Sequence, residues 1–281
     1  MLTIAAIAEL RRQLADWRRA GASIALVPTM GNLHRGHLSL VEEARRQAGR
    51  VVVSIFVNPT QFAPGEDYAS YPRTPQRDAE LLREAGADLL FLPGAAEVYR
   101  AGSLPATYVE VPGLSDELCG AFRPGHFRGV TTVVCKLFNM VQPDVALFGD
   151  KDYQQLTLIR RMVADLDLPV RIVGMPTVRE ASGLALSSRN GYLGSAEQQQ
   201  AARLYAVLQD TSAQLRAGGR NYQDLEGQAC AALTSAGFRP DYVAIRSADL
   251  SAPSGDARQL VILAAVRLGK ARLIDNLQVS L

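Results

Sequence analysis

Two histidines, His34 and His37, lie three positions apart in a turn that carries Gly31 and Gly36. The turn follows the apolar run 23–27 and is predicted to open a helix, whose first turn would place both imidazoles on one side. A helix N-terminus presents unpaired N–H groups and the positive end of a dipole, so it receives phosphate oxygens well. Because imidazoles can donate hydrogen bonds to the same oxygens, the turn predicts a site that stabilises phosphate charge as pyrophosphate leaves a nucleotide.

Zinc is the main alternative for this histidine pair. A zinc-binding helix carries its histidines four positions apart and needs a third ligand. The third histidine of the chain, His126, belongs to the basic loop 123–129, which fits an anion or carboxylate site and a surface loop nearly equally. We therefore favour phosphate binding for His34 and His37, and leave both readings of the loop open.

Three further polar segments follow apolar runs. The amides of Asn58 and Gln61 could hold hydroxyl and carboxylate oxygens, although a plain polar turn explains them more simply. Lys151 could meet phosphate at the start of a helix, or Asp150 could merely cap that helix. The hydroxyls and guanidinium of 187–189 suit phosphate and equally suit a surface turn.

The bulk composition is that of an ordinary globular chain. Its 281 residues are 48% hydrophobic and 21% charged, and the net charge of +2 predicts neither a nucleic acid nor a membrane partner. Three scattered cysteines without a CxxC pair indicate reduced thiols. The opening segment lacks a basic leader, so we expect a cytoplasmic protein.

Helices and strands alternate up to about residue 176. We expect helices at 4–20, 37–47, 75–85, 129–141 and 153–165, and strands at 23–27, 51–57, 88–92, 144–148 and 170–173. This rhythm predicts an α/β fold, a Rossmann-like parallel sheet with helices on both faces. Segments 28–37, 58–73, 149–152 and 177–190 would then follow strands and converge on one edge, where such sheets bind ligands.

The pattern changes after residue 176. Helices are expected at 196–217 and 222–236, and short strands at 242–246, 260–266 and 271–274, with a hairpin turn at Gly269-Lys270. We therefore predict two domains: a Rossmann-like nucleotide-binding domain over 1–176 and a small C-terminal α+β lid domain over 177–281.

Five stretches in this order resemble one enzyme family. They are PTMGNLHRGH, FVNPTQF, YPRT, LFGDKDYQQ and GLALSSRN, and with the flanking segments the match covers nearly the whole chain. The family is that of the pantoate–β-alanine ligases, or pantothenate synthetases, within the HxGH nucleotidylyltransferase superfamily. The resemblance implies that pantoate attacks the α-phosphate of ATP, giving pantoyl adenylate and pyrophosphate, and that β-alanine then displaces AMP. It also implies that the domain over 1–176 binds pantoate as well as the nucleotide, that the protein is a homodimer, and that Mg²⁺ is held through the ATP phosphates.

The resemblance also implies roles for individual residues. His34 and His37 resemble the family's phosphate-binding pair, the backbone of Met30 lines the reacting centre, and Gln61 and Gln155 grip the oxygens of pantoate. The remaining implied contacts are with the nucleotide. They are Lys151 for phosphate, Asp152 for the ribose, Gly149 and Val178 through their backbones, and Ser187, Ser188 and Arg189 as a flexible triphosphate clamp.

Two positions depart from the family pattern. Arg35 stands where an acidic or small residue is common, and we expect it to face solvent or add to phosphate attraction. Ser182 stands where Asp is common, which puts a loop-ordering contact in doubt. We expect 177–190 to be a mobile clamp, with Gly183 as a hinge and polar groups that lack partners until ATP binds.

Rival functions differ in their products and features. A nucleotidylyltransferase would leave the nucleotide on its product, and the HxGH turn alone does not separate it from a ligase. A non-catalytic nucleotide sensor would show an eroded set of site residues, which this chain does not. A tRNA-charging enzyme would need a basic or anticodon-reading domain, which the sequence does not show.

Overall fold

The structure is a computed structural model that describes residues 1–99 and 107–281. Its contacts divide the chain into two compact units, and each is described by itself: Met1–Asp150 with Leu158–Pro176, and Lys151–Thr157 with Thr177–Leu281. The domain border expected after residue 176 stays a prediction. The contacts place the short segment Lys151–Thr157 with the second unit. A single border after residue 176 would place it with the first unit.

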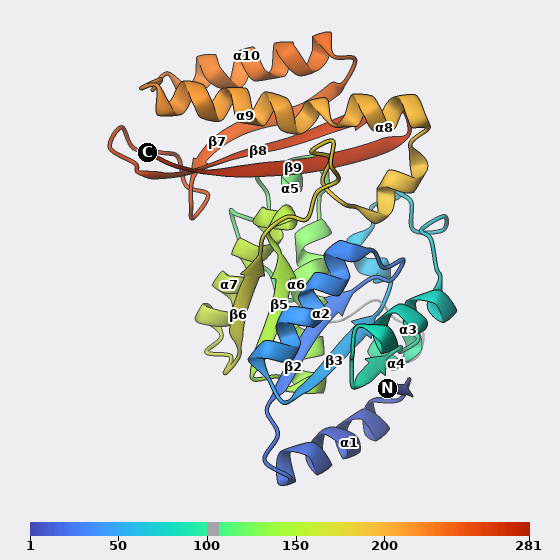
Figure 1. The fold of residues 1–281 in the computed structure, drawn as a ribbon. Coiled ribbons are helices and arrows are strands. Elements are labelled where there is room, and N and C mark those ends of the chain that lie inside the picture. Colours follow the sequence, from blue (N-terminus) through green and yellow to red (C-terminus); the bar gives the residue numbers. More distant parts are fainter. Residues whose placement is uncertain (100–106) are drawn as a thin grey trace. The chain divides into compact units, whose positions relative to one another are not determined.

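The first unit is built around a parallel sheet (Figure 1). Its strands are β1 (Leu2–Ile4), β2 (Ile24–Thr29), β3 (Arg50–Ile55), β4 (Leu89–Phe91), β5 (Val145–Gly149) and β6 (Arg171–Met175). Its helices are α1 (Ile7–Arg19), α2 (Arg35–Gln47), α3 (Pro75–Glu84), α4 (Ala95–Tyr99), α5 (Cys119–Phe122), α6 (His126–Val141) and 3-10 helix η1 (Pro59–Gln61), while η2 (Asp150–Asp152) and α7 (Tyr153–Asp165) cross the unit border.

The strand order of this sheet contains one reversal point. Across the described residues the order is β1-β4-β3-β2-β5-β6, and every pairing is parallel. The order reverses between β2 and β5, and open α/β sheets bind ligands beyond the carboxyl ends of strands at such a reversal. The turn after β2 and the residues after β5 both begin there.

Helices cover both faces of the sheet. On one face, Val41 and Ala44 of α2 pack with Val27 and Val53 of the strands in a buried cluster. On the other face α6 covers β5, where the rings of Phe138 and Phe148 meet edge to face with centroids 6.4 Å apart. The Rossmann-like parallel sheet is therefore confirmed.

The first residues of the chain differ from the expected helix at 4–20. Leu2–Ile4 forms β1, which pairs in parallel with Leu89–Phe91, and α1 begins at Ile7. Only Ile4 of this strand lies within the expected helix, and it reads as helical from the sequence because periodicity does not separate short strands from helical segments. The partner strand decides the outcome.

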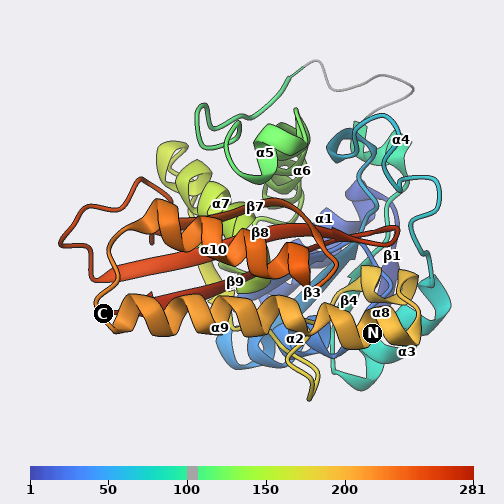
Figure 2. The same ribbon diagram turned by 90° about the horizontal axis from the view of Figure 1, so that it is seen from above.

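The second unit contains a three-stranded antiparallel sheet in the described residues, in the order β7-β8-β9. Its elements are 3-10 helix η3 (Ser188–Tyr192), α8 (Ser195–Ala201), α9 (Arg203–Arg216), α10 (Tyr222–Ser235), β7 (Arg239–Ser247), β8 (Gln259–Leu268) and β9 (Ala271–Ser280). Figures 1 and 2 show α9 and α10 side by side over one face of this sheet, and apolar residues of both helices and all three strands form one core. The small C-terminal α+β unit is confirmed, as is the turn at Gly269-Lys270, because Leu268 pairs with Ala271.

Two details of this unit differ from expectation. The single helix expected at 196–217 is two helices separated by Ala202, whose φ of −61° and ψ of −23° stay near helical values. Because this break occurs without a glycine or proline, the sequence carries no helix-breaking residue that would predict it. The strands are also longer than expected, and β9 continues through Asp275 and Asn276 to Ser280.

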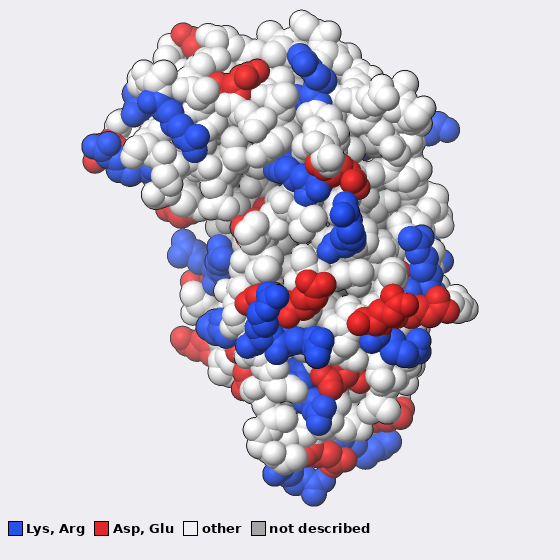
Figure 3. Space-filling view, in the orientation of Figure 1, with Lys and Arg blue, Asp and Glu red and all other residues white. Residues whose placement is uncertain are grey.

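The surface carries both signs of charge. On the face drawn in Figure 3, Lys and Arg side chains are interspersed with Asp and Glu side chains, in keeping with the net charge of +2. Among the helices of residues 1–99 and 107–281, none is long and apolar enough to cross a membrane.

Candidate active site

The two histidines of the β2–α2 turn cap the helix that they open. His34 is the N-cap residue, and its Nδ1 accepts a hydrogen bond from the Gly36 N–H at 3.2 Å. His37 Nδ1 accepts from the His34 N–H at 3.4 Å, which completes a reciprocal capping box. Because both backbone groups can only donate, both Nδ1 atoms must accept, and each neutral ring carries its proton on Nε2.

The hydrogen bonds of this turn differ from the expected pattern. The rings stand together, with centroids 4.1 Å apart. The amides of His34 and Gly36 bond to the imidazoles, and the His37 amide bonds to the His34 carbonyl at 2.8 Å. The expectation of unpaired N–H groups here is therefore wrong for these three amides.

A buried carboxylate from α3 holds this turn in place. Asp78 is 1% exposed, and it accepts hydrogen bonds from the backbone N–H groups of Asn32 at 2.9 Å and Leu33 at 2.8 Å. Thr74 donates its hydroxyl to the same carboxylate at 3.1 Å. Gly31 has φ +83°, and a Cβ there would lie 3.1 Å from Asp78 Oδ2, so the turn requires glycine.

Asn58 fixes the orientation of the Gln61 amide. Its Oδ1 accepts from the hydroxyls of Tyr99 at 2.6 Å and Thr60 at 3.0 Å, and its Nδ2 donates to Gly129 O and Gln61 Oε1, both at 3.1 Å. Burial raises the pKa of Tyr99 more than its hydrogen bonds lower it, so this hydroxyl stays a donor. The Asn58 amide can therefore take one orientation only, and it leaves Gln61 Nε2 as the donating end.

That donating end lies beside the histidine turn. Gln61 Nε2 is 3.1 Å from the sulfur of Met30, the residue that follows β2, and Gln61 is 8% exposed. An amide N–H held in one direction suits a carboxylate or hydroxyl oxygen. Asn58 is thus more than the plain polar turn that the sequence favoured.

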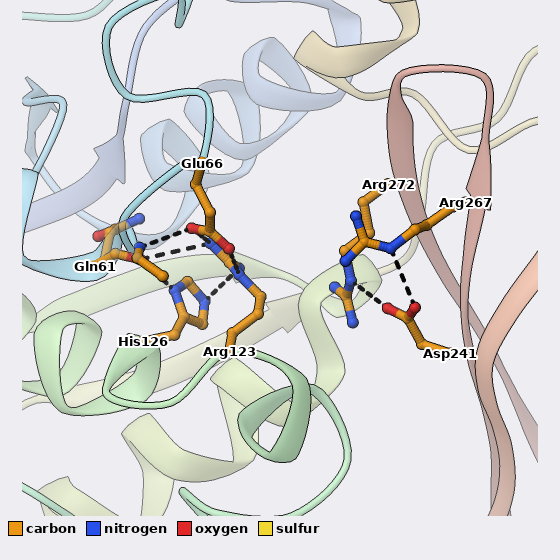
Figure 4. A network of polar contacts seen from close by, with 8 residues as sticks. Gln61, Glu66, Arg123, His126, Asp241, Arg267 and Arg272 are labelled. Carbon is orange, nitrogen blue, oxygen red and sulfur yellow. Dashed lines mark hydrogen bonds and ion pairs between the residues drawn. The ribbon is translucent and has the colours of Figure 1, made fainter.

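The basic loop before α6 bonds to the backbone of Gln61, as Figure 4 shows. His126 Nδ1 lies 2.8 Å from the Gln61 carbonyl and must donate to it, so His126 Nε2 accepts from Arg123 Nη1 at 2.9 Å. Arg123 also grips Glu66 with two nitrogens, at 2.6 and 2.8 Å. The loop is therefore more than a plain surface loop, because it supports Gln61, while its role as an anion site stays a prediction.

The pKa of Glu66 reflects this contact. Burial alone would raise this pKa. The hydrogen bonds and charge of Arg123, together with the Ala63 N–H, lower it by more, so the pKa of Glu66 lies below its ordinary value. The other ionic cluster in Figure 4 belongs to the second unit, where Asp241 meets both Arg267 and Arg272 across the strands. It is a cross-strand contact of the β7–β9 sheet.

In the second unit, the expected nucleotide residues Lys151 and Asp152 lie in η2, with Lys151 Nζ 3.5 Å from Asp152 Oδ2. Gln155 is half-buried in the first turn of α7. Tyr153 anchors this segment, because its hydroxyl donates to the Ala248 carbonyl at 2.8 Å. The segment that carries Lys151 is thereby attached to the turn that follows β7 in its own unit.

Segment 178–190 is a hydrogen-bonded hairpin. The Leu186 N–H bonds to the Val178 carbonyl at 2.9 Å, and the Glu180 N–H bonds to the Leu184 carbonyl at 2.8 Å. Gly183, with φ +92°, occupies the tight turn, where a Cβ would lie 3.1 Å from Cδ1 of Tyr205, and its role as a hinge stays a prediction. The expectation that this segment lacks partners without ATP is therefore wrong, while its motion stays a separate prediction.

The polar end of the hairpin is organised as well. Ser187 caps η3 by accepting from the Arg189 N–H at 3.2 Å, and Asn190 donates to the Ala185 carbonyl at 3.0 Å. Ser182, the departure from the family pattern, accepts from the Leu184 N–H at 3.4 Å, so it makes an ordering contact itself. The other departure, Arg35, is exposed.

Some buried polar residues that hold these segments were not assigned a role from the sequence. Asp78 stands in the first turn of a helix, where an acidic residue is ordinary because it complements the helix dipole. Asp275 and Asn276 interrupt the apolar strand pattern of β9, and that interruption is the signal that could have marked them. Gly149 lies where expected, at the carboxyl end of β5.

A parallel sheet with paired histidines after the strand at its reversal point defines a Rossmann-like nucleotide-binding class. The profile of the Pantoate-beta-alanine ligase family matches residues 2–278. A pantothenate synthetase of Methylococcus capsulatus is 61% identical over 274 residues, which are 97% of this chain and 96% of the relative.

Solved structures agree. Pantothenate synthetase from Thermus thermophilus has a TM-score of 0.92 at 50% identity, covering 99% of both chains. A Francisella tularensis pantoate-beta-alanine ligase, in complex with beta-gamma ATP and beta-alanine, has a TM-score of 0.79 at 34% identity, covering 99% of this chain and 97% of that one. This chain belongs to the pantoate–β-alanine ligase family, and the resemblance inferred from its sequence is confirmed.

Proposed function

We propose that this protein joins pantoate to β-alanine at the expense of ATP and releases pyrophosphate and AMP. The observation that carries the proposal is family membership over residues 2–278 together with the ordered turn of His34 and His37. A carboxylate oxygen of pantoate attacks the α-phosphorus, and the bond to the β-phosphate breaks as pyrophosphate leaves. The β-alanine nitrogen then attacks the acyl carbon, AMP leaves and the nitrogen loses a proton.

The described residues fit the electrostatic demands of this reaction. A carboxylate nucleophile is already ionised at neutral pH, so the protein needs no strong base and must instead orient two anions. The Nε2–H groups of His34 and His37 would donate to phosphate as charge moves to the leaving group. Gln61 Nε2, fixed by Asn58, would donate to pantoate, with Gln155 as its second amide.

The remaining assignments are proposals of the same kind. Lys151, Ser187, Ser188 and Arg189 would hold the phosphates, Asp152 the ribose, and the backbones of Met30, Gly149 and Val178 the nucleotide. Ser187 supports its part, because the hydroxyl that caps η3 by accepting can still donate to a phosphate oxygen.

Mg²⁺ would come with the nucleotide. In the part of the chain that the structure describes, no three His, Cys, Asp or Glu side chains group to hold an ion. Among the candidate phosphate ligands, the ammonium of Lys151 and the guanidinium of Arg189 suit phosphate oxygens and repel a divalent cation. Mg²⁺ held by the phosphates would supply charge neutralisation, and the protein would bind the remaining oxygens.

A product assay tests the proposal. The purified protein is given ATP, Mg²⁺, pantoate and β-alanine, and each is omitted in turn. We expect AMP, pyrophosphate and pantothenate, with pyrophosphate release requiring pantoate. ADP and phosphate as products would contradict the proposal, and a stable product that keeps the nucleotide would favour a nucleotidylyltransferase.

A homodimer and a cytoplasmic location are further proposals that rest on the family resemblance. Sedimentation velocity across a dilution series tests the first, because a homodimer gives a species of twice the chain mass, and its population shifts toward monomer on dilution. A sedimentation coefficient of the monomer at every concentration would contradict it. Fractionation of cells with an antibody against the chain tests the second.

A further inference from the structure

Two adjacent residues of β9, Asp275 and Asn276, lie between two segments proposed to bind ATP. Both side chains are almost fully buried, at 4% and 5% exposure. Burying a carboxylate and an amide inside a strand costs free energy unless both are fully hydrogen-bonded. Their partners therefore show what this polar pair does.

Asp275 binds the base of the 178–190 hairpin. Arg179 donates to its carboxylate with two nitrogens, at 2.6 and 2.8 Å, and the guanidinium lies 3.6 Å from the centroid of the Tyr205 ring. The same guanidinium donates to the Gly183 carbonyl at 3.1 Å, inside the hairpin turn. Because the planar guanidinium of Arg179 makes two hydrogen bonds to one carboxylate and stacks on a ring, both its distance from Asp275 and its orientation are fixed.

Asn276 binds the segment that carries Lys151. Its Nδ2 donates to the Lys151 carbonyl at 3.0 Å. Its own backbone N–H donates to Asp275 Oδ1 at 2.8 Å, and its carbonyl accepts from Arg179 at 3.3 Å. One dipeptide therefore joins the Lys151 turn to the hairpin that ends in Ser187, Ser188 and Arg189.

We propose that Asp275 and Asn276 are positioning residues for ATP, which hold the Lys151 turn and the 178–190 hairpin as one preorganised cation-bearing surface. Asn276 acts through the backbone of Lys151, and Asp275 acts through Arg179. The proposal rests on the proposed roles of Lys151 and 187–189 in phosphate binding. Its physical basis is that donors aimed in advance at developing charge stabilise it without reorganisation.

The test compares single variants by steady-state kinetics. Asn276→Ala removes the donor to Lys151, and Asn276→Asp removes it while keeping the shape of the side chain. Both should raise the ATP KM roughly tenfold, because small misplacements of aligned groups are costly, and leave the pantoate KM within about twofold. Gln278→Ala is the control, since Gln278 is an exposed amide on the same strand. It should leave both KM values unchanged.

Asp275→Asn tests the contact between Asp275 and Arg179. It removes the charge that binds Arg179 and should raise the ATP KM in the same way. Hydrogen exchange should accelerate at the Leu186 amide of the hairpin, while melting temperature is recorded for every variant. A variant that loses stability and raises both KM values equally would show a structural role and overturn the proposal.

A double-mutant cycle separates this proposal from the assignment beneath it. If Asn276 acts through Lys151, then Asn276→Ala should change the ATP KM by less than about twofold in a Lys151→Ala background, because coupled residues are not additive. Additive effects would overturn the proposal alone. An unchanged ATP KM in Lys151→Ala would overturn the role of Lys151 and this proposal with it, while product formation by the unaltered protein would still support the ligase function.

Discussion

At the scale of single residues, the backbone of the β2–α2 turn sets the proton positions of two imidazoles. Each Nδ1 accepts from a backbone N–H that also needs a partner as the helix begins. His34 and His37 therefore serve the fold through Nδ1, whereas the proposed chemistry uses Nε2. An alanine substitution would remove both roles together, so it is a poor probe of either.

Asparagine separates the two roles, because its Oδ1 can replace Nδ1 and nothing replaces Nε2. We predict that His34→Asn keeps the cap and the melting temperature but slows adenylate formation by about two to three orders of magnitude, the cost of losing one preorganised donor. Single-turnover release of pyrophosphate measures the rate.

His34→Gln is the matched control. Its amide can reach toward the Nε2 position while the cap is weakened, so it should lose about 0.5–2 kcal/mol of stability and retain more activity than His34→Asn. Equal single-turnover rates for His34→Asn and the parent would remove this imidazole from the chemistry.

Asp78 acts on the same turn from a distance in sequence. Asp78→Asn should destabilise the protein by about 1–3 kcal/mol, because the new NH₂ group opposes the N–H groups of Asn32 and Leu33. Urea unfolding measures the change. Glu80→Gln, on the exposed side of the same helix, should stay within about 0.5 kcal/mol of the parent. A similar small effect at Asp78 would mean that the turn does not depend on it.

At the scale of elements, α6 packs so closely on η1 that one position admits no side chain. A Cβ on Gly129 would lie 2.4 Å from the Thr60 carbonyl oxygen and 2.8 Å from Gln61 Cα. Both obstacles are backbone, so they move only if η1 moves. The helix therefore sets the position of the amide proposed to bind pantoate.

Gly129→Ala should displace η1, cost about 1–3 kcal/mol by overpacking and raise the pantoate KM more than the ATP KM. Gly227→Ala is the control, because Gly227 lies in α10 with open space around its Cα and should gain roughly 0.5–1 kcal/mol. Denaturant unfolding and steady-state kinetics measure the two effects. An unchanged pantoate KM in a destabilised Gly129→Ala protein would disconnect α6 from the site.

The hairpin 178–190 gives a second prediction at this scale. Its ladder predicts slow hydrogen exchange at the amides of Glu180, Gly183 and Leu186 before any nucleotide is added, with the exposed tip residue Ala181 as the fast reference. Exchange is measured residue by residue with and without ATP. Protection of these amides only in the presence of ATP would contradict the prediction, and would favour the original expectation of a clamp whose groups lack partners until ATP binds.

At the scale of the whole molecule, acid stability depends in part on Glu66. Its pKa is lowered in the folded protein, so its contribution is present above the ordinary glutamate value of 4.5 and is lost as the pH falls through the folded value. Glu66→Gln should therefore be less stable than the parent by about 1 kcal/mol near neutral pH. The difference should shrink in acid, where Arg123 and His126 remain beside it.

Urea titrations across this range check the sign, with the exposed Glu84→Gln as control. A gap between Glu66→Gln and the parent that stays constant down to acid pH would show that the contact is not protonation-linked.

Local patterns predicted most of the architecture. The apolar runs ending at Val27 and Phe148 gave parallel strands, and the spacing of His34 and His37 gave the turn between β2 and α2. These signals are short-range, because strand and helix periods are written in neighbouring residues. The family motifs then placed the remaining site residues on the chain, although their roles stay proposals.

Long-range polar contacts were beyond local patterns. The strand expected to end at Ile274 continues because Asp275 and Asn276 find partners in Arg179 and the Lys151 carbonyl, far away in sequence. An aspartate in an apolar strand pattern predicts the end of the strand, because a carboxylate is seldom buried unless it has a partner. Asp78 and Gly129 likewise have meaning only through what the fold places against them.

The bond from Asn276 to Lys151 also has a temporal consequence during synthesis. The two residues are 125 positions apart, and Asn276 is translated after Lys151. At about 5–20 residues per second, the ribosome needs roughly 6–25 s to cover that distance. For that interval a nascent chain holds its Lys151 turn without its anchor, so the order of translation itself delays completion of the proposed nucleotide-binding surface.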